Sequence, residues 1–253
     1  MRSAFKPVYN MGMILAGKTV LVTGAAQRIG RGIALGLAQA GADLALHFHR
    51  SAEEIQTTAG EIHRLGRRVI LSQADFSRPE QVTEMMASLF KQTQLFAVVN
   101  SAAIFQPLEW DTTGIDDWNL HLQINLTAPF LISQGFARQL PANERGRIVN
   151  ILDWRALRPG KDHFPYTISK AALAALTRSL AQALAPRIAV NGVALGAILP
   201  PADMADSAVI LQPVPSRRWG SPEEVAKTVE FLLAGPADIT GEIIHLDGGR
   251  HLV

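Results

Sequence analysis

The sequence predicts an α/β fold: a single doubly wound domain whose seven-stranded parallel sheet carries helices on both faces. Two observations lead to this prediction. Short β-rich apolar runs alternate with helical stretches along the chain, as expected when parallel strands are joined by crossover helices. Several of these runs are apolar throughout, which is typical of strands buried on both faces. The 253 residues can bury one large core, and no change in composition divides them.

The first half of the chain supplies four strands and three helices. KTVLVTG is a short β-rich run, and the periodic stretch after it ends on Gly41, a typical helix stop. DLALHFH and RVILSQAD read as the next strands, each followed by a helical stretch, and LFAVVNSAA reads as the fourth strand. The expected strands cover 18–24, 43–49, 68–75 and 95–103, and the expected helices cover 28–41, 51–66 and 78–93.

The second half repeats the pattern. A long helix begins near the Asp116–Asp117 pair, where acids complement the helix dipole, and the strand GRIVNILD follows it. The helix that starts SPEE has a serine cap, proline at its first position and acids in its first turn. The expected strands cover 146–153, 188–196 and 241–249, and the expected helices cover about 115–140, about 165–185 and 221–235.

Two segments stand outside this alternation. Residues 1–16 lack the apolar core and cleavage site of a secretory signal, and we interpret them as an extension before the domain 17–253. The segment 197–221 contains four prolines, which oppose a continuous helix. A long irregular insertion in a compact domain predicts a substrate loop with at most one short helix.

Composition excludes several classes of function. Hydrophobic residues make up 48% and charged residues 18%, and the net charge is +2. Basic residues are dispersed, which disfavours a nucleic-acid partner, and no apolar run reaches the roughly 18 to 20 residues that span a membrane. The absence of cysteine excludes disulfides and thiolate chemistry, and we expect a cytoplasmic protein. The seven histidines show no metal-ligand spacing, so we expect no metal site.

The first strand-to-helix turn, TGAAQRIG, is a candidate phosphate-binding loop. Glycines let the backbone turn tightly and approach a ligand, and the free N–H groups of the following helix attract anions. Arg28 occupies the place of a middle glycine, so the full dinucleotide fingerprint is incomplete, and an ordinary tight turn is the alternative. The candidate cofactor residues in this turn are Gly24, Arg28, Ile29 and Gly30.

The end of the second strand, HFHRS, indicates which dinucleotide binds. NAD-binding folds place an acidic residue here for the ribose hydroxyls, but this chain has His49, Arg50 and Ser51. A guanidinium matches a 2′-phosphate in charge and geometry, so the sequence favours NADPH. A solvated arginine at a strand end is the alternative.

Tyr166 and Lys170 form a candidate acid–base pair. They lie four positions apart, on one face of the helix expected after the fifth strand. A phenol has a pKa of about 10, and a nearby ammonium is expected to lower that pKa toward the working range. Asp153, thirteen residues before Tyr166, ends the fifth strand.

These motifs together resemble the short-chain dehydrogenase/reductase family. TGAAQRIG, NSAA, Asn125 in INLTAPF, YTISK and the terminal LDGG follow the family's order from about residue 17 to the end. The resemblance implies that Tyr166 is the proton donor, that Lys170 supports it and binds the ribose, and that Asn125 maintains a water-linked proton path. It also implies a homotetramer. The further cofactor residues that it implies are Asp75, Phe76, Asn100, Ser101 and Ala102.

Three departures from the family pattern point to one branch. Arg28 replaces the middle glycine, NSAA replaces NNAG, and Asp153 replaces the catalytic serine. With HFHRS and LDGGRHLV, these features resemble the pteridine reductases, including the bacterial dihydromonapterin and dihydrofolate reductases of short-chain type. The resemblance aligns Phe105 with an aromatic residue that stacks on the pterin. Arg28, Phe105, Asp153 and Tyr166 are therefore the expected substrate-binding residues.

The resulting hypothesis is NADPH-dependent reduction of dihydromonapterin, dihydrobiopterin or dihydrofolate to the tetrahydro form, with the proton passing through Tyr166 and Asp153. One alternative is an NADP-dependent carbonyl reductase or alcohol dehydrogenase in which Asp153 merely replaces serine. Another is a catalytically silent NADP(H)-binding sensor or scaffold, against which the intact Tyr166–Lys170 pair argues. A core position for Phe105 is the alternative to a role in substrate binding.

Overall fold

The computed structural model describes residues 13–200 and 208–253 and contains one seven-stranded sheet. All neighbouring strands are parallel, and their spatial order is β3-β2-β1-β4-β5-β6-β7. The predicted α/β doubly wound sheet is confirmed. The strands are β1 (Thr19–Val22), β2 (Asp43–Phe48), β3 (Val69–Gln73), β4 (Ala97–Asn100), β5 (Gly146–Asp153), β6 (Ile188–Leu195) and β7 (Ile243–Leu246).

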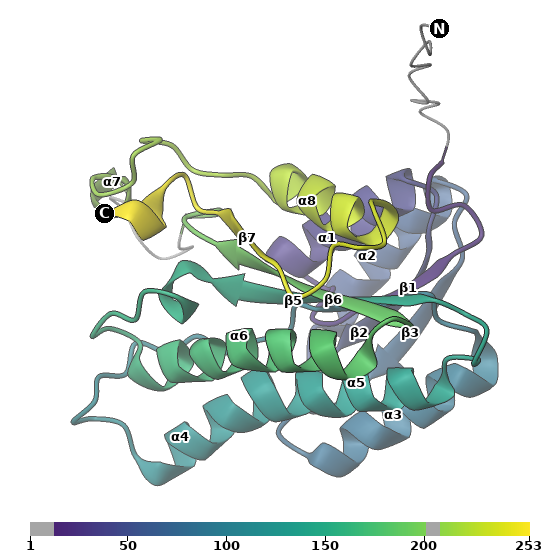
Figure 1. Ribbon diagram of the computed structural model, residues 1–253, viewed down its shortest axis with the longest axis horizontal. Helices are drawn as coiled ribbons and strands as arrows, with labels where there is room; N and C mark the ends of the chain where they lie inside the picture. Colours follow the sequence, from purple (N-terminus) through teal and green to yellow (C-terminus); the bar gives the residue numbers. More distant parts are fainter. Residues whose placement is uncertain (1–12, 201–207) are drawn as a thin grey trace, which may run out of the picture.

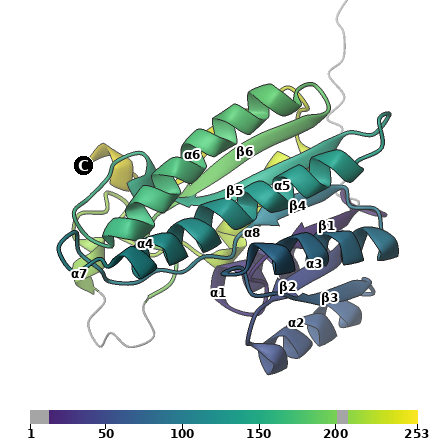
Figure 2. The ribbon, with the colours of Figure 1, turned by 90° about the horizontal axis from the view of Figure 1, so that it is seen from below.

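Helices cover both faces of the sheet, as Figures 1 and 2 show. On one face lie α1 (Arg28–Gln39), α2 (Ala52–Arg64) and α8 (Pro222–Ala234), with α1 packed against α8. The other face carries α3 (Pro79–Gln92), α4 (Ile115–Leu122), α5 (Ala128–Gln139) and α6 (Phe164–Leu184). Short pieces complete the described chain: α7 (Ala208–Leu211) and the 3₁₀ turns η2 (Trp154–Ala156) and η3 (Arg250–Leu252).

Burial on both faces explains why the strands read as continuous apolar runs. In β1, Val20 and Val22 pack into the core under α1 and α8, whereas Leu21 packs into the core under α3 and α5. All three side chains are fully buried. Alternate residues of a strand point to opposite faces, so a strand covered on both sides must be apolar at every position.

Chain order reverses beside β1, which pairs with β2 on one side and β4 on the other. The register aligns the strand ends, since Val22 lies opposite both Leu46 and Val99. In open α/β sheets, the crevice outside the carboxyl ends at such a reversal is where ligands bind. The topology therefore places a site between the loops that follow β1 and β4.

The long helix expected at about 115–140 contains a wider turn. Between α4 and α5, Gln123–Thr127 form a π-helical segment, and the N–H of Ala128 bonds to the carbonyl of Gln123. A π turn adds one residue to the helical repeat and is frequent at functional sites. The expected cap of α8 is confirmed, because Ser221 and Glu224 form a reciprocal capping box.

The two segments set apart by the sequence differ in outcome. Residues 1–12 of the expected extension lie outside the described part of the chain, but Leu15 is 1% exposed and belongs to the core. Of the expected loop 197–221, the described residues contain the one short helix α7. Among the described residues, no helix combines the length and apolarity needed to cross a bilayer.

Candidate active site

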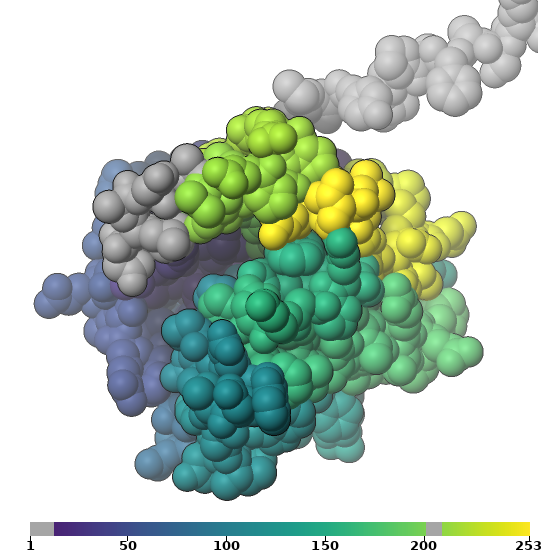
Figure 3. Space-filling view, turned by 90° about the vertical axis from the view of Figure 1, so that its left-hand side faces the viewer, coloured from purple at the N-terminus to yellow at the C-terminus, as the bar shows by residue number. Residues whose placement is uncertain are grey.

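The predicted site residues come from several loops that meet at the carboxyl edge of the sheet. Gly24 follows β1, Ser51 follows β2, Asp75 follows β3, Ser101 follows β4 and Asp153 ends β5. Figure 3 looks onto this edge, where the surface is hollowed between the blue atoms on one side and the teal atoms that follow β4. The strands thus bring to one place residues far apart in the sequence.

Close backbone packing explains the glycines of the first turn. Gly24 has φ +66°, and a Cβ there would lie 2.9 Å from Cα of Ala102. A Cβ on Gly30 would collide with the carbonyl of Gly24. Arg28, at the expected middle-glycine position, also has a left-handed φ of +50°. The departure in sequence therefore keeps the glycine-like backbone and adds an exposed guanidinium at the start of α1.

His47 and Thr23 hold this turn against the sheet. The Gly24 N–H donates to Nδ1 of His47 at 3.2 Å, and His47 Nε2 lies 3.1 Å from the carbonyl oxygen of Ala74. Burial lowers the pKa of His47 to about 4, so the ring is neutral at neutral pH and can accept that hydrogen bond. The Thr23 hydroxyl accepts from the N–H groups of Ser101 and Ala102. Sequence reasoning did not assign these roles, although the strand alternation at His47 points that ring toward the turn.

The residues expected around the adenosine half of the cofactor cluster at the ends of β2 and β3. His49 Nε2 lies 3.6 Å from Asp75 Oδ2, and the buried ring of Phe76 stacks on His47. Arg50 is exposed, and in the described parts of the chain its guanidinium makes no hydrogen bond or ion pair. Its charge is therefore available to an incoming phosphate, and the binding of a 2′-phosphate by Arg50 stays a prediction.

Asn100 at the end of β4 leaves a polar atom free. Its amide donates to Asn150 Oδ1 at 2.8 Å, and Asn150 in turn donates to the hydroxyl of Thr177. Asn100 Oδ1 is buried and has no partner among residues 13–200 and 208–253. Buried acceptors are normally satisfied, so this atom, the tight glycine turn and the free Arg50 guanidinium fit a bound nucleotide.

Asp153 and Tyr166 meet in the site, as predicted. The Tyr166 hydroxyl donates to Asp153 Oδ2 at 3.2 Å, and both groups are largely buried. Burial raises the pKa of Asp153, and the charges of Arg155 and Lys170 oppose only part of that effect. Burial also raises the pKa of Tyr166 well above its usual value, and the neighbouring Asp153 raises it further. Tyr166 is therefore protonated at neutral pH and can donate a proton.

Lys170 lies on the same helix face but does not act on Tyr166 as the sequence suggested. Its ammonium is buried and donates to the carbonyl of Ile151 at 2.8 Å, 5.7 Å from the centre of the Tyr166 ring. Burial lowers the pKa of Lys170 to about 8, and Asp153 partly opposes this. The expectation that Lys170 lowers the Tyr166 pKa is wrong here, because burial and Asp153 determine that pKa.

Asn125 sits in the π-helical segment and joins it to α6. Its side chain is fully buried, donates to the carbonyl of Ile104 and to the hydroxyl of Ser169, and accepts from the Ile104 N–H. Ser169 lies one position before Lys170 on α6. Asn125 thus links the loop after β4 to the helix that carries the catalytic candidates, and its proton-path role stays a prediction.

Phe105 is not the core residue of the alternative interpretation. It is 53% exposed, forms a T-shaped pair with Tyr166 at 4.6 Å between ring centroids, and is stacked on His163 at 3.9 Å. His163 has a left-handed φ of +51° just before α6. The guanidinium groups of Arg155 and Arg250 each lie 4.8 Å from the ring centre of Trp154. These aromatic groups form a wall beside the Asp153–Tyr166 pair.

Arg155, which lies against this wall, was not identified from the sequence. Arg155 contacts both Asp153 and Asp162, and it lies 5.8 Å from the ring centre of Phe105. The available signal was an arginine two residues after the candidate acid. Arg28 joins the loop after β6 through the carbonyl of Pro200, at 3.5 Å, and its contact with substrate stays a prediction.

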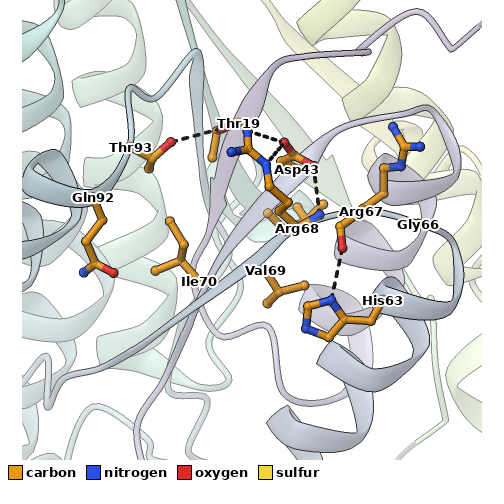
Figure 4. Close-up of a pocket in the computed structure, with 11 residues that line it drawn as sticks. Thr19, Asp43, His63, Gly66, Arg67, Arg68, Val69, Ile70, Gln92 and Thr93 are labelled. Carbon is orange, nitrogen blue, oxygen red and sulfur yellow. Dashed lines mark hydrogen bonds and ion pairs between the residues drawn. The ribbon is translucent and has the colours of Figure 1, made fainter.

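Other clusters lie apart from this chemistry. A pocket of about 630 Å³, drawn in Figure 4, lies at the opposite edge, where β1, β2 and β3 begin. Its Arg68 side chain is paired with Asp43, and the His63 ring bonds the Arg67 backbone carbonyl. The basic groups in view therefore serve the local structure.

One group of potential metal ligands was also not identified from the sequence. The ligand atoms of His245, Asp247 and His251, around the end of β7, lie within 4.8 Å of one another. The two imidazoles are stacked 3.9 Å apart at 12°, so their nitrogen lone pairs do not converge on one point. Asp247 already accepts from the N–H groups of Gly249 and His251 and bonds Nδ1 of His251. The grouping stabilises the C-terminal turn.

The doubly wound sheet, the glycine turn at the strand reversal and the Tyr166–Lys170 helix define a nucleotide-dependent oxidoreductase. The chain belongs to the short-chain dehydrogenase family, whose family model, described as short chain dehydrogenase, matches residues 18–209. Members of this family use nicotinamide cofactors.

Individual relatives match over almost the whole chain. A 3-oxoacyl-[acyl-carrier-protein] reductase from Synechocystis is 32% identical over 93% of this chain and 97% of its own. The crystal structure of FolM alternative dihydrofolate reductase 1 from Brucella canis, complexed with NADP, is 35% identical, with a TM-score of 0.86 over 95% of this chain and 96% of that one. A short chain dehydrogenase from Burkholderia cenocepacia in complex with NADP is 37% identical, with a TM-score of 0.87 over 93% and 98%.

Proposed function

We propose that the protein is an NADPH-dependent reductase that converts a dihydropterin, such as dihydromonapterin or dihydrobiopterin, or dihydrofolate to its tetrahydro form. One observation carries the proposal: a carboxyl group, Asp153, occupies the position of the family's catalytic serine and bonds the hydroxyl of Tyr166 at 3.2 Å. The name of the Brucella canis relative, an alternative dihydrofolate reductase, supports the same substrate class.

A carboxyl group suits a pterin better than a ketone. A ketone oxygen only accepts hydrogen bonds, whereas a pterin presents ring nitrogens and an amino group, and a carboxyl can donate or accept according to its protonation. The ring of Phe105 is 53% exposed beside Tyr166, so its apolar surface is available for contact with a heteroaromatic ring. Asp153 and Phe105 together therefore favour a flat, nitrogen-rich substrate.

The proton chemistry follows from the environment of the pair. A nicotinamide held at this site would supply hydride to a ring carbon, and the protein would have to deliver a proton to the adjacent nitrogen. Tyr166 keeps its proton at neutral pH because burial raises its pKa, and Asp153, whose pKa burial also raises, shares a hydrogen bond with the same oxygen. With a pKa of about 8, the Lys170 ammonium is largely protonated at neutral pH, and its charge favours the ionised form of Asp153.

The preference for NADPH depends on the end of β2. No carboxylate occupies positions 49–51. The guanidinium of Arg50, which bonds no other residue in the described parts of the chain, suits a 2′-phosphate, with the hydroxyl of Ser51 beside it in sequence. Two of the structural neighbours hold NADP, which supports this choice. By family resemblance the proposal also includes a homotetramer in the cytoplasm.

A carbonyl reductase of the same family is the second candidate. The name of the Synechocystis relative, an oxoacyl reductase, favours it, with Asp153 then replacing serine as a hydrogen-bonding group. The burial of Asp153, Tyr166 and Lys170 side by side argues against a silent NADP(H)-binding protein, because burying three ionisable groups without a chemical use is costly.

The test follows NADPH oxidation with dihydromonapterin, dihydrobiopterin, dihydrofolate and a panel of ketones and oxoacyl thioesters. We expect turnover of at least one dihydropterin or dihydrofolate. Turnover of ketones or thioesters alone would contradict the proposal in favour of the second candidate, and no turnover would favour the silent protein.

In the same assay, Arg50→Ala should raise KM for NADPH far more than KM for NADH. Equal losses would remove the 2′-phosphate assignment.

A further inference from the structure

We propose that Arg155 is a positioning residue of the active site: it orients the carboxyl group of Asp153 toward the Tyr166 hydroxyl and is itself held in place by Asp162. The inference rests on the proposed pairing of Asp153 with Tyr166, but it does not depend on which substrate the pair serves.

Arg155 gives the two oxygens of Asp153 different partners. Oδ1 of Asp153 accepts from the backbone N–H of Arg155 at 2.9 Å and faces the guanidinium Nη1 at 3.4 Å. Oδ2 is left to the Tyr166 hydroxyl at 3.2 Å. Because Oδ1 is held on the Arg155 side, rotation of the carboxyl group is restricted and Oδ2 stays in line with Tyr166.

Asp162 and two aromatic rings fix the guanidinium. Nη2 and Nε of Arg155 donate to the two oxygens of Asp162 at 2.5 and 3.3 Å. This bidentate pair of hydrogen bonds fixes the orientation of the planar guanidinium group. The plane also lies near the Trp154 ring at 4.8 Å and the Phe105 ring at 5.8 Å. The Arg155 side chain is only 16% exposed, so it differs from a surface arginine that moves freely in solvent.

A guanidinium has a particular advantage at this position. The planar group can bond Asp162 with one edge, face Asp153 with its remaining nitrogen and lie against the rings of Trp154 and Phe105. An ammonium group is not planar and cannot make all of these contacts at once. Lys170 does not substitute for it. Its ammonium donates to the carbonyl of Ile151, so it affects Asp153 through its charge rather than by a hydrogen bond.

The titratable groups around Asp153 predict how its protonation responds. Arg155 comes from the turn after β5, Tyr166 and Lys170 come from α6, and Asp162 with His163 forms the outer layer around Arg155. Burial raises the pKa of Asp153, and the Arg155 charge is the first of the effects that oppose it. Removing that charge must therefore raise the Asp153 pKa further.

The first experiment measures the pH titration of the Asp153 carboxyl group in the absence of substrate. In full-length protein labelled with ¹³C at the aspartate carboxyl carbons, the Asp153 signal is assigned by its loss in Asp153→Asn and then titrated with pH. We expect Arg155→Met to move this titration to higher pH, and Arg155→Lys, which keeps the charge, to move it less. Arg158→Met is the matched control, because Arg158 is an exposed arginine in the same turn. An unmoved titration in Arg155→Met would overturn the proposal.

The second experiment measures turnover with whichever substrate the panel identifies. We expect Arg155→Met to lower kcat up to about 100-fold with little change in KM, as for a misplaced catalytic group, and to shift the Asp153 limb of the pH profile to higher pH. Arg155→Lys should recover part of kcat, and Arg158→Met should match the wild type. A loss in KM alone, or equal losses in Arg155→Met and Arg158→Met, would contradict the proposal.

The two proposals fail in different ways. If only ketones are turned over, the pterin assignment fails, yet the Arg155 experiments proceed with the ketone. If a pterin is reduced but Arg155→Met leaves the carboxyl titration and kcat unchanged, only the role of Arg155 is lost. Should Arg155→Met not fold, the comparison of Arg155→Lys with the wild type gives the decision, because loss of the in-plane contacts alone should still lower kcat.

Discussion

Two buried carboxyl groups, Asp153 at the end of β5 and Asp247 directly after β7, have similar positions, but their pKa values are shifted in opposite directions. Each accepts from the backbone N–H two residues later, at 2.9 Å in both cases. Their side chains are 14% and 2% exposed. Burial raises the pKa of Asp153. Burial also acts to raise the pKa of Asp247, but hydrogen bonds from His251 and Gly249 outweigh it, and that pKa lies below its usual value.

The second oxygen of each carboxyl group explains the difference. Oδ2 of Asp247 accepts from the backbone N–H of His251 and bonds Nδ1 of its ring, both at 2.8 Å. Oδ2 of Asp153 meets the neutral hydroxyl of Tyr166 at 3.2 Å. His251 stabilises the Asp247 carboxylate through two bonds to Oδ2, whereas Oδ2 of Asp153 has one neutral donor and burial outweighs the Arg155 contacts at Oδ1. Asp247 is thus committed to the C-terminal turn, and Asp153 remains available for proton exchange.

The largest expected effect tests the role of Asp153. Asp153→Asn keeps an acceptor for the Arg155 N–H but cannot exchange a proton, so we expect kcat to fall by about 10²- to 10⁴-fold, the usual contribution of an acid–base group. The measurement is steady-state turnover with the substrate found in the panel. Asp247→Asn is the control and should keep kcat within a few fold. An Asp153→Asn variant that retained more than about a tenth of kcat would break the contrast.

The free energy of unfolding should depend on Asp247, which the previous experiment uses only as a control. Asp247→Asn places an amide NH₂ group where the carboxylate accepts hydrogen bonds, so a buried donor is left unsatisfied. We expect a loss of about 1–3 kcal/mol in the free energy of unfolding, measured by urea denaturation. Asp238→Asn, at an exposed aspartate, should change this free energy little. Equal stabilities for the two variants would mean that the hydrogen bonds to Asp247 contribute nothing to folding.

The sequence predicted those parts of this picture that depend on periodicity and strand order. The bounds of β5 and the position of Asp153 at its end follow from a β-rich run between helical stretches, and the shared helix face of Tyr166 and Lys170 follows from the 3.6-residue helical repeat. The contacts of Arg155 depend instead on how the turn between β5 and α6 folds back, with His163 in a left-handed conformation. No periodicity encodes that path.

The pKa of Tyr166 is a second property that the sequence pattern could not predict. A lysine four residues away on a helix suggested a lowered pKa, but the effect of a charge depends on burial and on where the ammonium points. Lys170 points to the Ile151 carbonyl, and Tyr166 is 7% exposed beside a carboxyl group. The packing of α6 against β5 determines both facts, and it becomes visible only in three dimensions.

The smallest expected effect is the pH dependence of the free energy of unfolding. It is also the most specific, because its sign differs between the two carboxyl groups. The usual aspartate pKa is 3.8, and the folded-state pKa of Asp247 lies below it. The unfolded chain therefore binds the proton more tightly, so the stability that Asp247 contributes is present above pH 3.8 and is lost as the pH falls through its folded pKa. For Asp153 the folded pKa lies above 3.8, so its contribution is present below that value and is lost as the pH rises through the folded pKa.

Urea denaturation of the wild type, Asp153→Asn and Asp247→Asn at a series of pH values from about 3 to about 7 measures both signs. The stability difference between wild type and Asp247→Asn should grow with pH at the acid end. The difference between wild type and Asp153→Asn should shrink with pH above 3.8. Neither slope can exceed about 1.4 kcal/mol per pH unit for a single group. Slopes of the same sign would mean that hydrogen-bond donors, rather than burial, govern Asp153 as well, and a carboxylate held in that way would be a poor partner for proton transfer from Tyr166.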